Sequence, residues 1–255
     1  MEKERLDILV QRQAGVTRSK AQGLIQTGQV LGPDGERLDK PGLRLAIDTP
    51  LEIIAQQRFV SRGGDKLLAA IEAFRPSLEG KTCIDAGAST GGFTDCLLQH
   101  GAAKVFAVDV GYGQLAWSLR QDPRVVVMER CNVRHLKPED LGERPAFFTA
   151  DCSFISLRTI LPPLLNVLAP SAEGIVLIKP QFEAGPENVG KGGVVRDAAV
   201  REQVVEEVCE TARDLGFDQV DVIPSPLRGP AGNIEFLAYL HGWKGLPEAA
   251  LQALG

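Results

Sequence analysis

The fold is decided by one stretch, residues 83–93, which reads Cys83-Ile84-Asp85-Ala86-Gly87-Ala88-Ser89-Thr90-Gly91-Gly92-Phe93. Its first residues are apolar and suit a buried strand, and its middle is rich in glycine. Glycine lets the backbone turn sharply and approach a bound ligand closely. The stretch therefore predicts a strand, a ligand-binding loop and a helix that begins near Phe93.

Strand-like and helical segments alternate on both sides of this loop from residue 60 onward. The segment 197–215 has the clearest helical pattern. Alternation at this spacing predicts a doubly wound α/β fold whose seven-stranded sheet is mostly parallel. The expected strands lie at 82–86, 105–109, 125–129, 147–151, 174–178, 219–223 and 234–240.

The first 58 residues follow a different pattern. Two segments with helical spacing, at about 6–14 and 18–27, are each followed by a glycine, and short strand-like runs lie at 29–31 and 51–54. We expect a small α+β domain here and an α/β domain after it. The predicted ranges are 1–58 and 59–245, with a short polar bridge at Gln56-Gln57-Arg58-Phe59, a linker at 59–62 and a C-terminal tail at 246–255.

Composition favours a cytoplasmic globular protein. The net charge is −5, and residues 1–58 hold nine Lys/Arg against eight Asp/Glu, so charge alone is weak support for nucleic-acid binding. The five cysteines have no CxxC spacing and the three histidines are isolated, so we predict free thiols and no metal site. The N-terminus has no signal-like apolar core, and no stretch approaches the roughly 18 apolar residues of a membrane helix.

The strand after the glycine-rich loop ends in an acid, Asp109, 24 positions after Asp85. An acid at this place can accept hydrogen bonds from both ribose hydroxyls of an adenosine. The glycines follow the spacing Gx3GG, which differs from the GxGxxG fingerprint of dinucleotide-binding proteins. A nucleotide-type cofactor other than a dinucleotide is therefore favoured.

Four charged residues are placed where they can act on a ligand. Lys66 enters the first helix of the larger domain, Asp151 and Lys179 end the fourth and fifth strands, and Glu235 opens the last strand. Strand carboxyl ends face the ligand crevice of such sheets, so Asp151 and Lys179 should meet there. A lysine at the end of a buried strand is otherwise costly.

These motifs carry a family resemblance. The form DxGxxxGGF resembles the S-adenosylmethionine loop of Rossmann-like methyltransferases, and the set Lys66, Asp151, Lys179 and Glu235 is similar to the K-D-K-E tetrad of FtsJ-like 2′-O-methyltransferases. The pattern RLDILVQRQAGVTRSKAQGLIQTGQV in the first domain resembles the RNA-binding S-four domain. Together they resemble the TlyA family, often labelled hemolysin A, over residues 4–244.

The resemblance implies an enzyme that transfers a methyl group from S-adenosylmethionine to a cytidine 2′-hydroxyl of ribosomal RNA. Lys179 would take the hydroxyl proton, Asp151 would hold Lys179 and the hydroxyl in place, and Lys66 and Glu235 would form a supporting pair. Asp85 would lie near the methionine end of the cofactor, Asp109 near its ribose and Asn132 near its adenine. The full set expected to bind the cofactor is Asp85, Ala86, Gly87, Ala88, Ser89, Gly91, Gly92, Phe93, Asp109, Val110, Asn132 and Asp151.

RNA, in the form of ribosomal RNA or a ribosomal subunit, is the expected partner, with no membrane and no obligate protein partner. Its candidate contacts are Arg5, Arg18, Lys20, Arg62 and Arg228. We also expect the glycine-rich segment 183–196 to be a loop that orders around the substrate. TlyA-type linkers can carry a tryptophan where this chain has Phe59, which leaves open whether the linker acts as a switch.

Other functions remain possible at this stage. The sequence Asp151-Cys152-Ser153-Phe154 lacks the prolines of the [DN]PP[FY] motif that amine-methylating enzymes carry, and Cys152 lacks the preceding proline of cytosine C5 methyltransferases. A non-catalytic RNA-binding or ribosome-assembly factor is one alternative, and a membrane-lytic protein is a remote one. The target nucleotide, the ribosomal subunit, the assembly state of the substrate and the oligomeric state cannot be predicted from the sequence.

Overall fold

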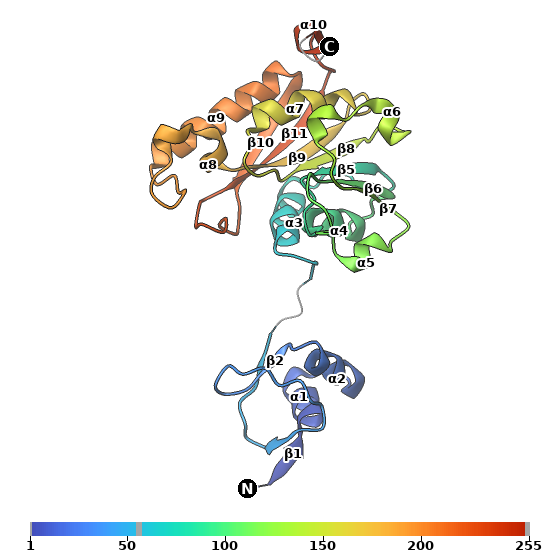
Figure 1. Cartoon of the computed structure of the whole chain (residues 1–255), viewed down its shortest axis with the longest axis vertical. Helices are drawn as coiled ribbons and strands as arrows, with labels where there is room; N and C mark the ends of the chain where they lie inside the picture. Colours follow the sequence, from blue (N-terminus) through green and yellow to red (C-terminus); the bar gives the residue numbers. More distant parts are fainter. Residues whose placement is uncertain (1, 55–57, 253–255) are drawn as a thin grey trace. The chain divides into compact units, whose positions relative to one another are not determined.

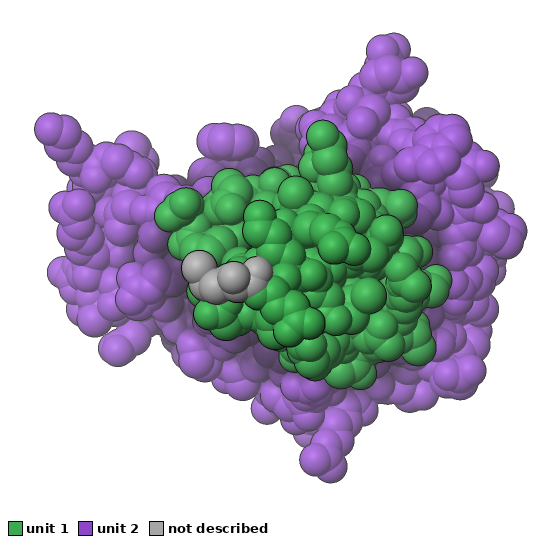
Figure 2. Space-filling model, turned by 90° about the horizontal axis from the view of Figure 1, so that it is seen from below, with its two compact units in different colours: residues 1–57 green, residues 58–255 purple. Residues whose placement is uncertain are grey.

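The computed structural model describes residues 2–54 and 58–252. The chain divides into two compact units, residues 1–57 and residues 58–255 (Figure 2). The sequence-based boundary was drawn one residue later, between 58 and 59. Part of the polar bridge expected there, Gln56 and Gln57, lies outside the described residues.

The smaller unit is built around two helices. Helix α1 ends at Gly15 in a left-handed conformation, and the hydroxyl of Thr17 accepts a hydrogen bond from the backbone of Lys20 at the start of α2. The apolar faces of both helices bury a small core that includes Leu6, Val10 and Ile25. Its elements are β1 (Lys3–Arg5), α1 (Leu6–Ala14), α2 (Arg18–Gln26), β2 (Val30–Leu31), β3 (Arg44–Ala46) and β4 (Glu52–Ile53), with β1 antiparallel to β3 and β2 to β4.

The larger unit contains the predicted seven-stranded sheet (Figure 1). Five strands run parallel, while β11 is antiparallel to both β9 and β10, so the sheet is mostly parallel as expected. The strand order is β10-β11-β9-β8-β5-β6-β7. These strands span β5 (Thr82–Ala86), β6 (Lys104–Val108), β7 (Val125–Met128), β8 (Phe147–Ala150), β9 (Glu173–Ile178), β10 (Phe217–Pro224) and β11 (Phe236–Trp243).

Helices cover both faces of this sheet. On one face α3 (Gly63–Phe74) and α4 (Gly92–Gln99) pack against the strands, and on the other α7 (Leu157–Asn166) and α9 (Ala198–Asp214) do so (Figure 1). Successive strand residues point to opposite faces, so the two apolar cores are separate. The shorter helices are α5 (Trp117–Arg120), η1 (Val133–His135), α6 (Pro138–Leu141), α8 (Pro180–Glu183), η2 (Pro186–Asn188) and α10 (Glu248–Gln252).

Two details differ from the sequence-based expectation. Strand β11 begins at Phe236, so Glu235 precedes this strand instead of lying within it. The predicted C-terminal tail contains the short helix α10. Among the described residues, no helix is both long enough and apolar enough to cross a lipid bilayer.

Candidate active site

The carboxyl ends of the parallel strands carry the charged residues of the site. Asp109 follows β6, Asp151 follows β8 and Lys179 follows β9. Parallel strands end at one edge of the sheet, and Asp151 and Lys179 meet there, as the sequence predicts.

Two ion pairs organise the site. Lys179 Nζ lies 2.6 Å from Asp151 Oδ1, although the angle at this contact does not make a hydrogen bond. Lys66 Nζ donates a hydrogen bond of 2.6 Å to Glu235 Oε2. The Glu235 side chain is 0% exposed, so its charge is compensated by Lys66 rather than by solvent. The structure therefore brings the four residues together as two pairs, as expected.

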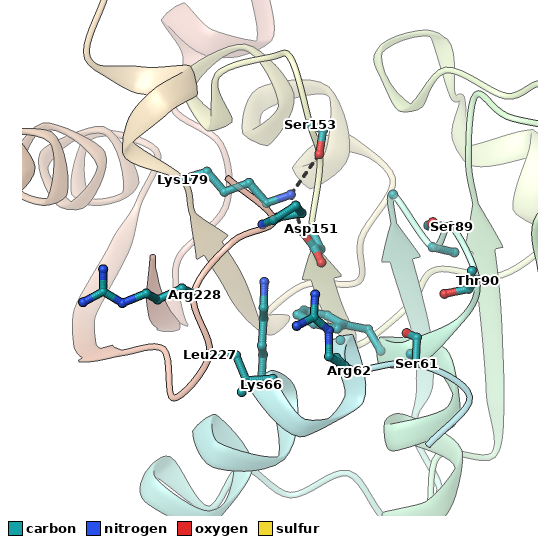
Figure 3. Close-up of a pocket in the computed structure, with 16 residues that line it drawn as sticks. Ser61, Arg62, Lys66, Ser89, Thr90, Asp151, Ser153, Lys179, Leu227 and Arg228 are labelled. Atoms are coloured by element: carbon teal, nitrogen blue, oxygen red, sulfur yellow. Dashed lines mark hydrogen bonds and ion pairs between the residues drawn. The ribbon is translucent and has the colours of Figure 1, made fainter. Parts of the chain in front are cut away.

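A cavity of about 280 Å³ lies between these pairs (Figure 3). Lys66, Asp151 and Lys179 all line it, whereas Glu235 is not among its lining residues and supports Lys66 from behind. Two residues that we expected to contact RNA, Arg62 and Arg228, line the same cavity. The cavity thus has a cationic rim beside a single carboxylate, which suits a ligand that carries phosphate.

A second cavity, of about 440 Å³, adjoins the first. The two share four lining residues, which are Gly87, Ser89, Asp151 and Ser153. The second is also lined by Asp109, Val110 and Asn132, the residues expected to hold the nucleoside part of the cofactor. Its volume is within the range of small-molecule sites, roughly 300–1,000 Å³.

The glycine-rich loop forms the wall between the strand ends and the cavities. Gly87 has a φ of +84°, and a Cβ atom there would lie 2.7 Å from the carbonyl oxygen of Asp151. Gly91 also has a positive φ and packs against Leu119 instead of lining a cavity. Of the loop residues expected to bind cofactor, those that line a cavity are Gly87, Ala88, Ser89, Gly92 and Phe93.

Asp109 ties the loop to the strand beside it. Its carboxylate accepts hydrogen bonds from the backbone N–H of Ser89 at 2.8 Å and of Gly111 at 2.7 Å. One oxygen therefore holds the cofactor loop and the other holds the segment after β6. The carboxylate also faces the larger cavity, where a ribose could reach it.

Asp85 is placed differently from the expectation. Its carboxylate is fully buried and accepts hydrogen bonds from the hydroxyls of Thr94 (2.7 Å) and Thr149 (2.9 Å). Burial raises the pKa of Asp85 to about 6, partly offset by these two hydrogen bonds. Neither Asp85 nor the buried Ala86 is among the residues that line the two cavities, so both support the loop from beneath.

Cys152 does not have the properties of a nucleophile. Burial raises the pKa of its thiol to about 12, and Sγ lies 3.5 Å from the carbonyl oxygen of Ala86. A nucleophilic cysteine needs a lowered pKa to form the thiolate. Cys152 therefore acts as a packing residue, which agrees with the absence of a preceding proline in the sequence.

In the smaller unit, Arg5 and Arg18 converge on a buried acid. Both guanidinium groups lie 3.0 Å from the carboxylate of Asp7, which also accepts a hydrogen bond from Gln22. The hydrogen bond from Arg5 is the main cause that lowers the pKa of Asp7. Both arginines remain about half exposed, and Lys20 lies exposed nearby on α2.

Several further residues, which no sequence motif indicates, line the cavities. Ser61 and Thr90 line the smaller cavity, Gln114 lines the larger one, and Ser153 lines both. Ser153 is the most informative, because it accepts a hydrogen bond of 3.0 Å from Lys179 Nζ. Its position two residues after Asp151 was the available signal, but the direction of its hydroxyl depends on the loop conformation.

Comparison with known proteins agrees with this geometry. The family model of the FtsJ-like methyltransferases matches residues 59–241. The Mycobacterium tuberculosis protein TlyA, named as a 16S/23S rRNA (cytidine-2′-O)-methyltransferase, is 47% identical over 255 residues, or 96% of this chain and 95% of that protein. YqxC of Bacillus subtilis is 50% identical over 246 residues, or 95% of this chain and 87% of that protein.

A solved structure extends the comparison to the fold. A protein of Streptococcus thermophilus described as a hemolysin is 42% identical and has a TM-score of 0.71, covering 100% of this chain and 95% of that one. The family match spans most of the chain, and the relatives match nearly all of it. The chain therefore belongs to the FtsJ-like methyltransferases and, among them, to the TlyA/hemolysin A family of ribosomal RNA methyltransferases.

Proposed function

We propose that this protein transfers a methyl group from S-adenosylmethionine to the 2′-hydroxyl of a cytidine in ribosomal RNA. The observation that carries the proposal is the Lys179–Asp151 ion pair at the junction of the two cavities. Asp151 lines both cavities and Lys179 lines the smaller one. A base held at such a junction can act on an acceptor in one cavity beside a cofactor in the other.

The residues of the larger cavity fit the cofactor. We assign Asp109 to its ribose, Asn132 and Val110 to its adenine, and the backbone at Gly87, which lines both cavities, to its methionine end. When bound, S-adenosylmethionine supplies a methyl group on a positively charged sulfur. This arrangement needs no metal ion, because Lys179 can accept the proton of the hydroxyl group.

The chain's own residues perform the proton transfer. A ribose hydroxyl is a weak nucleophile, so it must lose its proton as the new bond forms. Lys179 Nζ receives this proton, and Asp151 keeps Nζ at the junction. Lys66, fixed by Glu235, presents its charge to the same cavity, where it can orient the acceptor nucleotide.

The smaller unit supplies RNA binding in this proposal. Asp7 holds the guanidinium groups of Arg5 and Arg18 in place, so both can meet phosphate with little loss of side-chain entropy. Its two-helix pattern and its resemblance to the S-four domain support this assignment. Arg62 and Arg228 would contact RNA at the active site. Because ribosomal RNA is the proposed substrate, we place the protein in the cytoplasm.

The proposal is tested with radiolabelled S-adenosylmethionine, unmodified bacterial ribosomal subunits or total RNA, and purified protein. Lys179→Ala should lower methyl transfer by a factor on the order of 100 or more, because a general base is lost. The matched control is Lys244→Ala, which removes an exposed lysine that pairs with Asp218 instead of lining the site. Wild-type label on a ribose 2′-oxygen, retained in the control, is the expected result.

Two outcomes would contradict the proposal. Label on a base would refute ribose methylation while leaving the methyltransferase assignment intact. Cofactor binding without transfer to any RNA would favour the non-catalytic RNA-binding factor.

A further inference from the structure

Ser153 contacts the proposed base directly, although it is outside the charged tetrad. Its hydroxyl oxygen accepts a hydrogen bond of 3.0 Å from Lys179 Nζ (Figure 3). On its other side, Nζ faces Asp151 Oδ1 at 2.6 Å. Ser153 also lines both cavities, so it lies where acceptor and cofactor must meet.

These two contacts restrict the orientation of the lysine amine. A neutral amine has two N–H bonds and one lone pair, arranged around nitrogen with the Cε bond in a tetrahedron. The N–H that Lys179 donates to Ser153 fixes one of these directions, and the ion pair with Asp151 holds Nζ from another side, so few directions remain for the lone pair. The Lys179 side chain lines the smaller cavity, where the acceptor hydroxyl would be bound.

The loop that carries Ser153 contacts both β5 and α8. Asp151 N donates a backbone hydrogen bond to Ala86 at the end of β5. The ring of Phe154, whose φ is +65°, packs 5.1 Å from the ring of Phe182 in α8, the helix that directly follows Lys179. The segments that bear the hydroxyl and the amine therefore contact each other beside the Lys179–Ser153 hydrogen bond, through a Phe154 ring that is 91% exposed.

We propose that Ser153 is a positioning residue that directs the lone pair of Lys179 at the acceptor hydroxyl. The inference rests on the proposed function and names a further residue that its chemistry needs. The hydroxyl proton passes to Nζ, and the oxygen bonds to the transferred carbon. The electron pair of the broken carbon–sulfur bond stays on sulfur, so the step needs no further reactant. Without Ser153 the amine of Lys179 can rotate about its Cε–Nζ bond, so its lone pair points at the acceptor hydroxyl less often.

The experiment compares Ser153→Ala and Ser153→Thr in the full chain. We expect Ser153→Ala to lower kcat about tenfold or more, a part of what a positioned base provides. The KM for RNA and the Kd for S-adenosylmethionine should stay within about threefold of wild type. Ser153→Thr keeps the hydroxyl and should restore most of kcat.

Ser156→Ala is the matched control, because Ser156 lies in the same loop. Its hydroxyl donates to Glu183 Oε2 at 2.5 Å and accepts from the backbone of Arg158, so it caps α7. This change should lower the Tm and leave kcat near the wild-type value.

Three outcomes would overturn the inference. The first is wild-type kcat in Ser153→Ala. The second is a loss of kcat in that variant that is accompanied by an equal loss in the Ser156→Ala control, which indicates a merely structural role. The third is no rescue by threonine. If wild-type protein itself transfers no methyl group to RNA, the proposed function fails and the inference fails with it, and this result is recognised from the wild-type assay alone.

Discussion

At the scale of single residues, the buried carboxyl of Asp85 has a consequence for stability. Its pKa in the folded protein is about 6, above its ordinary value of 3.8, because burial disfavours the charged form. The folded protein therefore binds this proton more tightly than the unfolded chain does. The contribution of Asp85 to stability falls as the pH rises from about 4 through 6, and above that the folded state carries the cost of a buried charge.

Asp85→Asn removes this titration and keeps a side chain that can bond to Thr94 and Thr149. We expect the free energy of unfolding of the wild type, relative to the variant, to fall by about 2 kcal/mol between about pH 4.5 and 7.5. Urea denaturation of both proteins at each pH measures the difference, in which other titrating groups cancel. A difference that is independent of pH, or that rises with pH, would show that Asp85 stays ionised when buried.

The sequence predicts which residues lie at the ends of the parallel strands, but it does not predict which neighbours the side chain of Asp85 contacts. The rule that strand ends meet at one sheet edge is independent of detail, so it predicts that Asp151 and Lys179 lie together. The contacts of Asp85 depend on register: Asp85 pairs with Thr149 on the adjacent strand, so both side chains lie on the same face. No pattern within a single strand reveals its register against a neighbour. The same limit applies to Ser153, whose direction follows from a loop.

At the scale of elements, the glycine-rich loop gives a prediction for cofactor affinity. In Gly87→Ala the new Cβ would lie 2.7 Å from a backbone oxygen, in a residue with a φ of +84°. Backbone cannot move aside as a flexible side chain can, so the loop must shift away from Asp151, which changes the wall that both cavities share. We expect the Kd for S-adenosylmethionine, measured by calorimetry, to rise at least tenfold, which corresponds to about 1.4 kcal/mol.

Gly80→Ala is the matched control for this change. Gly80 also has a positive φ, of +71°, but no atom lies within 4 Å of the added Cβ. It should show the conformational strain alone, as a lower Tm with unchanged cofactor affinity. Equal loss of affinity in both variants would mean that general destabilisation, and not the loop, governs binding.

Element prediction succeeded where patterns were long. All seven strands of the larger sheet occur where apolar runs predicted them, because each run is bounded by turn residues. In the smaller unit the sequence predicted β2 and β4, but it did not predict β1 and β3, which contain three residues each. The sequence of β1 is Lys3-Glu4-Arg5 and that of β3 begins with Arg44, so neither has the apolar run by which a strand is recognised, and the two form by pairing with each other.

At the scale of the whole molecule, the two units have separate cores. Leu6, Val10 and Ile25 belong to the core of the smaller unit, and the residues of the active site all belong to the larger one. The sequence suggested this division because the pattern changes near residue 58. The charge of −5 gave no guide to RNA binding, because a net charge does not show where the cations lie.

This division predicts that the two binding activities can be separated. A fragment of residues 58–255 keeps every residue that lines the two cavities, so its Kd for S-adenosylmethionine should stay within about threefold of the full chain. It lacks Arg5, Arg18 and Lys20, so its affinity for ribosomal RNA, measured by filter binding, should fall about tenfold or more. The full chain with Arg5→Gln and Arg18→Gln is the control and should show a smaller loss in the same direction. If the fragment binds RNA as tightly as the full chain, the smaller unit is not the RNA-binding domain, and the contacts must lie at Arg62, Arg228 and the rim around them.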